Sequence, residues 1–243
     1  MKDSSSYPTA VPEQALNSHY LQLLNKFKKY NSHGHKLLCS YMSAGEKYQN
    51  GLLVIGREPF YWHEEFSPEE IYRRGAQYVF DSKVLQHGAN ELISPSHNFS
   101  CNSFNDPFLK CIKEVVMQLG ICRQHENWSS YIALTYLFKL AFSRKGYLPE
   151  KPRNIQIELC REILHLELSI LKPKRVLFLT GMKYMKEFLN LSDDVELTGY
   201  VHNLGEFDYG IHKAQTVITV NPVNCPRQKL VSMILERFAN NKH

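Results

Sequence analysis

The sequence alternates short, continuously apolar segments with longer segments of helical periodicity. Four apolar segments have the length of a buried strand, namely "GLLVIG", "YIALTYLF", "RVLFLTG" and "QTVITV". Strands that are apolar on both faces are typical of parallel sheets, because helices cover both sides of such sheets. The pattern therefore predicts an α/β fold, a three-layer αβα sandwich around a four-stranded parallel sheet.

Helical segments lie between the predicted strands and carry clear start and stop signals. Asp106 and Pro107 open the segment 106–120 as an N-cap and a first-turn proline. The segment 155–173 carries a stripe of large apolar residues and ends at Pro173. Residues 192–213 show no regular pattern, and further helices are predicted over 12–30, 67–77, 182–191 and 227–241.

Length and composition predict a single globular domain. The 243 residues include 43% hydrophobic and 22% charged residues, which are ordinary values for a folded chain. We expect residues 1–12 to form a flexible leader and residues 13–243 to form one α/β domain. We expect this domain to be a monomer.

Composition also disfavours several classes of protein. No run approaches the roughly 18 apolar residues that span a bilayer, and the amino-terminal segment lacks the apolar core of a signal peptide. The six cysteines form no CxxC pair and no cluster with histidine at zinc spacing. We therefore expect a cytoplasmic protein with reduced thiols, without membrane contact, metal or cofactor. The formal net charge of +5 favours contact with phosphate groups.

The loops that follow the predicted strands are the first candidates for a functional site. Ligands of open parallel sheets bind beyond the carboxyl ends of the strands. The loop after the first strand reads "GREPFYWHEEF" and concentrates carboxylates and aromatic rings, and the loop after the last strand reads "NPVNCPRQ". We expect these two loops to form walls of one pocket.

In order and spacing, these segments resemble the motifs of the uracil-DNA glycosylase superfamily. Its members place a G-x-[D/E/N]-P-type motif after the first strand and an H-P-S-type motif after the last. "GREPF" is similar to the first motif, "NPVNCPRQ" stands where the second belongs, and "FNDPFLKCIKEV" is similar to the proline-capped helix of the family. The resemblance covers roughly residues 50–240 and implies the family's fold, a four-stranded parallel αβα sandwich.

The resemblance implies catalytic roles for two residues. Glu58 corresponds to the carboxylate that stabilises an oxocarbenium-like sugar cation and orients a water molecule. Asn221 stands where the family usually has histidine, and its side-chain amide would stabilise the negative charge of the departing base.

Other positions would bind the base and the DNA backbone. Phe60 and Phe99 are similar to aromatic residues that contact a flipped base in the family. Tyr136 falls near the base-reading asparagine, but a tyrosine hydroxyl cannot reproduce the paired donor and acceptor of an amide. Arg227 and Lys229 would hold phosphates in a loop that lacks the family's bulky wedge residue.

The function implied is that of a uracil-DNA glycosylase-like protein. It would hydrolyse the N-glycosidic bond of uracil or another altered base in single-stranded or double-stranded DNA. The alternative is a catalytically inactive member that binds nucleic acid or protein through the same loops. A third hypothesis is an α/β enzyme that acts on a free nucleoside or nucleotide.

Several candidate residues also have a purely structural interpretation. Glu58 can cap its loop or pair with Arg57, and Asn221 can act as a turn residue before Pro222. Tyr136 can be a strand residue that faces a helix, and aromatic residues after the first strand can close the core.

Overall fold

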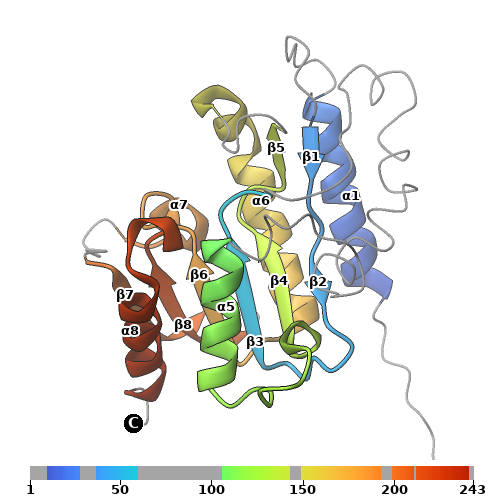
Figure 1. Ribbon diagram of the computed structural model, residues 1–243. Coiled ribbons are helices and arrows are strands. Elements are labelled where there is room, and N and C mark those ends of the chain that lie inside the picture. Colours follow the sequence, from blue (N-terminus) through green and yellow to red (C-terminus); the bar gives the residue numbers. More distant parts are fainter. Residues whose placement is uncertain are drawn as a thin grey trace, which may run out of the picture.

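A mostly parallel sheet lies at the centre of the structure, a computed structural model (Figure 1). The structure describes residues 10–27, 37–59, 106–142, 149–192, 199–210 and 212–240. Within these residues the sheet has six strands in the order β2-β4-β3-β6-β8-β7. A separate antiparallel pair joins β1 (Leu37–Cys39) to β5 (Leu140–Phe142).

The four inner strands are the four apolar segments that the sequence predicts. They are β3 (Leu52–Gly56), β4 (Ile132–Tyr136), β6 (Arg175–Leu179) and β8 (Lys213–Thr219). Strand β3 pairs in parallel with β4 on one side and with β6 on the other, and β6 pairs in parallel with β8. The predicted parallel strands are thus confirmed.

The sheet has two strands beyond the four predicted parallel ones, because an antiparallel strand covers each edge. Strand β2 (Ser43–Ala44) pairs with β4, and β7 (Val201–Asp208) pairs with β8. Most of β7 is only partly buried, as expected of an edge strand, so its sequence "VHNLGEFD" has no continuous apolar run. The segment 192–213, without a predicted element, therefore contains a regular strand.

One face of the sheet is covered by α1 (Ala10–Phe27), α6 (Glu150–Leu171) and α7 (Met185–Leu189). Helix α1 begins inside the segment predicted as a leader, since its Pro12 lies in a first turn that tolerates proline. The apolar stripe of this helix is fully buried and comprises Leu16, Tyr20, Leu23, Leu24 and Phe27.

The other face is covered by α5 (Pro107–Gln118) and α8 (Arg227–Ala239). Helix α5 begins as predicted, with the Asp106 side chain as its N-cap and Pro107 in its first turn. Helices on both faces of the sheet confirm the predicted three-layer α/β sandwich. Two short 3-10 helices, η2 (Trp128–Tyr131) and η3 (Pro222–Asn224), complete the described elements.

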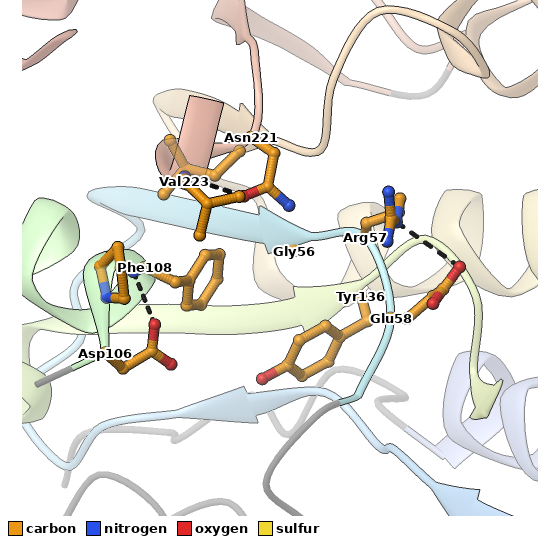
Figure 2. A pocket seen from close by; sticks show the side chains of 10 residues that line it. Gly56, Arg57, Glu58, Asp106, Phe108, Tyr136, Asn221 and Val223 are labelled. Atoms are coloured by element: carbon orange, nitrogen blue, oxygen red, sulfur yellow. Dashed lines mark hydrogen bonds and ion pairs between the residues drawn. The ribbon is translucent and has the colours of Figure 1, made fainter. Parts of the chain in front are cut away.

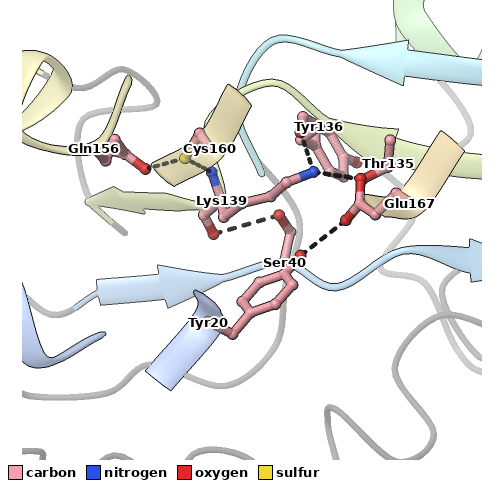
Figure 3. Close-up of polar contacts among 8 residues, drawn as sticks. All are labelled: Tyr20, Ser40, Thr135, Tyr136, Lys139, Gln156, Cys160 and Glu167. Atoms are coloured by element: carbon pink, nitrogen blue, oxygen red, sulfur yellow. Dashed lines mark hydrogen bonds and ion pairs between the residues drawn. The ribbon is translucent and has the colours of Figure 1, made fainter. Parts of the chain in front are cut away.

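A buried ion pair connects the layers on the α1 side of the sheet (Figure 3). The Lys139 ammonium lies 2.7 Å from Glu167, and both side chains are fully buried. Lys139 also donates to the Thr135 hydroxyl at 2.8 Å and to the Tyr136 carbonyl at 2.5 Å. The Tyr20 hydroxyl of α1 donates to the other Glu167 oxygen at 3.0 Å. Burial and this carboxylate raise the pKa of Tyr20, so its hydroxyl remains a donor.

The cysteines that the structure describes are all buried free thiols, at positions 39, 111, 122, 160 and 225. Burial raises the pKa of the Cys39, Cys111 and Cys160 thiols to about 12. These three thiols are therefore protonated at neutral pH and are poor nucleophiles. Among the described helices, none is both long and apolar enough to cross a bilayer.

Replacing Glu167 with glutamine is expected to lower the free energy of unfolding by about 3 kcal/mol, because the Lys139 charge then stays buried without its counter-ion. The measurement is urea unfolding of Glu167→Gln beside the wild type. The control is Glu162→Gln on the same helix, where the carboxylate is half exposed and pairs with His19. A loss below about 1 kcal/mol in Glu167→Gln would contradict the importance assigned to the buried pair.

Candidate functional site

A pocket lies beyond the carboxyl ends of the parallel strands (Figure 2). Strand β4, which follows β3 in the chain, lies on one side of β3, and the next strand of this sheet, β6, lies on the opposite side of β3. This reversal creates the topological switch point at which open α/β sheets bind ligands. A cavity of about 280 Å³ occupies this place. It is lined by Gly56, Arg57, Glu58, Asp106, Pro107, Phe108, Tyr136, Leu179, Asn221 and Val223.

Glu58 lines this pocket and is only 7% exposed, so its carboxylate is largely withdrawn from bulk water. Its Oε1 atom lies 3.5 Å from the Arg57 Nε atom and 3.9 Å from an Arg153 terminal nitrogen. The Arg153 guanidinium in turn lies 4.9 Å from the centre of the Tyr184 ring. The predicted pairing with Arg57 is therefore present together with the predicted position in the pocket wall.

Backbone hydrogen bonds hold the loop that carries Glu58. The amide of Leu137 donates to the Gly56 carbonyl at 2.8 Å, and the amide of Phe138 donates to the Arg57 carbonyl at 3.0 Å. The turn after β4 therefore holds the end of β3. Lys139, which ends this turn, is the residue of the buried ion pair.

Asn221 lines the pocket and also caps the helix η3. Its Oδ1 atom accepts a hydrogen bond from the Val223 amide at 3.1 Å. The predicted role as a turn residue before Pro222 is confirmed. Because Oδ1 is used by the cap, the Nδ2 amide is the donor that remains, and Figure 2 shows it pointing away from Val223.

Aromatic rings form one wall of the pocket. Tyr136, the last residue of β4, stacks on Phe108 of α5 with ring centres 6.4 Å apart and planes inclined by 22°. Tyr136 therefore faces a helix, as its structural interpretation predicts, and it also lines the pocket. Its ring lies so near Gly56 that a Cβ atom there would stand 2.7 Å from it.

Arg227 and Lys229 do not line the pocket. The Arg227 side chain lies 2.9 Å from the Glu114 carboxylate, and the Lys229 ammonium lies 4.9 Å above the Tyr200 ring. Arg227 and Lys229 both lie in the first turn of α8. Phe60 and Phe99 lie outside the described residues.

The sequence patterns assign no role in the site to five of the lining residues, Asp106, Pro107, Phe108, Leu179 and Val223. The sequence predicts Asp106 only as a helix cap and places Phe108 only inside the helix that this cap opens. Leu179 ends β6, and Val223, which is 66% exposed, stands at the pocket rim. For Asp106 a signal was available, because a cap at the carboxyl edge of a sheet places its side chain beside the switch point.

The arrangement combines an apolar cleft with a few polar groups of fixed orientation. Carboxylates come from Glu58 and Asp106, a hydroxyl from Tyr136, and an amide donor from Asn221. Apolar walls with a few convergent polar groups are typical of sites for small planar ligands. Among the described residues, histidine, cysteine and acidic side chains form no group of three able to hold a metal.

Replacing Gly56 with alanine is expected to lower the free energy of unfolding by about 2 kcal/mol, because the new methyl group would overlap the Tyr136 ring. The matched control is Gly51→Ala at the other end of β3, where a Cβ atom meets nothing within 4 Å. Thermal unfolding of both variants measures the difference. Equal stability of the two variants would contradict the tight contact between Gly56 and Tyr136.

The sequence was compared with two sets of known proteins. Models of known protein families give no match to the sequence, and curated proteins give none either. The resemblance to uracil-DNA glycosylases therefore depends on the motifs and their spacing alone. The function of the pocket has to be inferred from the residues that line it, because a fold does not determine a function.

Proposed function

We propose that this protein is a uracil-DNA glycosylase-like hydrolase that cleaves the N-glycosidic bond of uracil or another altered base in DNA. One observation carries the proposal. Glu58, Tyr136 and Asn221, which the motif resemblance singles out at the ends of three different strands, line the same cavity at the switch point of the sheet. These positions lie more than 60 residues apart in the sequence, and the carboxyl ends of β3, β4 and β8 bring them to one edge of the sheet.

The reaction breaks the bond between C1′ of the sugar and a ring nitrogen of the base. The base leaves with the electron pair, the sugar carbon develops positive charge, and water supplies a hydroxyl group to C1′ and a proton to the base. A carboxylate beside the sugar stabilises the cation. In this proposal Glu58 has that role, and Arg57 and Arg153 hold its carboxylate at the pocket wall.

The departing base carries the electron pair and needs a hydrogen-bond donor. Asn221 Nδ2 is that donor in the proposal, because its own Oδ1 atom is fixed by the Val223 amide. An amide fixed in this way loses little freedom when the ligand binds, which favours stabilisation of developing charge. The stacked rings of Phe108 and Tyr136 provide an apolar wall for a planar base.

A second candidate function is binding without catalysis, through the same pocket. The observation that favours it is the position of Glu58 Oε1, which lies near two guanidinium groups. A carboxylate held in this way can serve as a structural anchor of the loop. A binding module of this kind would retain a ligand and release no base.

We expect the wild type to release base from oligonucleotides that contain one altered base, and Glu58→Gln and Asn221→Asp each to slow release by about a hundredfold. Asn221→Asp keeps an oxygen for the η3 cap, removes the amide donor and places a negative charge beside the departing base. Release is scored by alkaline cleavage at the abasic site, on single-stranded and duplex substrates that carry uracil or an oxidised cytosine.

The control variant is Glu162→Gln, which removes one negative charge from a half-exposed side chain outside the pocket. It is expected to release base at the wild-type rate. Melting temperatures of all variants separate loss of catalysis from loss of folding. Base release by neither the wild type nor any variant, from any substrate tested, would refute the glycosylase and leave the binding module.

A further inference from the structure

Two residues on different sides of the pocket share one local structure. Asp106 and Asn221 each precede a proline and each cap the helix that begins there. The Asp106 Oδ1 atom accepts from the Phe108 amide at 2.7 Å, and the Asn221 Oδ1 atom accepts from the Val223 amide at 3.1 Å. In both residues a backbone amide two positions later therefore fixes the orientation of the side chain.

The fixed orientation decides which polar atom each residue presents to the cavity. Asp106 uses one carboxylate oxygen for its cap and keeps the other, which can only accept hydrogen bonds. Asn221 uses its only oxygen and keeps an NH₂ group, which can only donate. Figure 2 shows the second Asp106 oxygen on the Tyr136 side of the pocket and the Asn221 amide nitrogen at another wall. Both residues are part of the cavity lining.

Asp106 is well placed to be a ligand contact and not only a cap. Its residue surface is 7% exposed, so the second oxygen has little access to bulk water. Within the described part of the chain, the Phe108 amide donates a hydrogen bond to the Asp106 carboxylate. A charged oxygen in such a site gains most from a ligand that supplies an N–H donor.

We infer that the pocket binds an amino-keto base of the cytosine type, in which the exocyclic amine donates to Asp106 and the carbonyl oxygen accepts from Asn221. This inference rests on the proposed function, because it names the base that the same pocket takes. Cytosine carries an amine at one side of its ring and a carbonyl at the other, which matches one acceptor and one donor in the wall. Altered cytosines keep both groups.

The same wall disfavours uracil. Uracil carries a carbonyl oxygen where cytosine has its amine, and two acceptor oxygens facing each other cannot form a hydrogen bond. A pocket built to bond one group rejects the analogue that lacks it, because the protein group is then left unpaired. The substrate class thus follows from the residue type at position 106 and not from the fold.

The test is titration of the ¹⁵N-labelled full chain with free cytosine and free uracil, followed by amide chemical shifts. The wild type is expected to bind cytosine about tenfold more tightly than uracil. Asp106→Asn is expected to reverse the preference, because asparagine caps a helix as well as aspartate does and turns an NH₂ donor into the pocket. Asp106→Ser also keeps a cap, and its shorter side chain is expected to abolish the discrimination.

Glu114→Gln is the matched control, since it removes the same charge from the same helix outside the pocket. It is expected to keep the preference for cytosine. Equal or tighter binding of uracil by the wild type, binding of neither base at millimolar concentration, or an unchanged preference in a folded Asp106→Asn variant would each overturn the inference.

Binding of free bases does not require cleavage of any bond, so the two proposals fail separately. Preferential binding of cytosine without base release from any oligonucleotide would support the inference and refute the hydrolase. Release of uracil with no preference for cytosine would support the hydrolase and overturn the inference.

Discussion

The buried ion pair between Lys139 and Glu167 is the interaction on which the geometry of the pocket depends. It joins helix α6 to the turn that follows β4, and Tyr20 extends the connection to α1. The same turn donates two backbone hydrogen bonds to the end of β3. Two charges removed from water hold their positions only when each is fully paired. The pair thereby fixes the carboxyl ends of β3 and β4 against the helices behind them.

The two faces of the sheet contribute different groups to the pocket. The α1 and α6 face supplies the buried network and Arg153, which anchor the strand ends and the Glu58 loop. The α5 and α8 face supplies the caps, whose remaining polar atoms line the cavity. Local hydrogen bonds of this kind cost little additional order when a ligand binds. Polar groups in the pocket are therefore oriented before any ligand arrives.

Much of the fold was predictable because its inner strands are buried on both faces and read as continuous apolar runs. Edge strands escaped prediction for the opposite reason, since β7 is half solvent-exposed and β2 has two residues. Helix α5 was predictable from Asp106 and Pro107 because capping is a local interaction. The burial of Lys139 was not predictable, because its partner Glu167 lies 28 residues away in the sequence.

The candidate site was predictable only in part, because some of its contacts join residues that are distant in the sequence. Glu58 and Asn221 stand in motifs at strand ends, so their position follows from topology. The ion pair of Arg227 with Glu114 joins two helices, and no local pattern reveals such a partner. Asp106 was recognised as a cap, but the direction of its second oxygen depends on how α5 lies on the sheet.

The packing of α5 against α8 determines how large a ligand the pocket can hold. Asp106 is placed by the first turn of α5, whereas Asn221 belongs to the segment that leads into α8. The distance between the two caps is therefore governed by how closely these helices pack, through buried residues such as Cys111, Val115, Leu230 and Ile234. Exchanging small for large side chains in that interface would widen or narrow the cavity while every residue of its wall stayed the same.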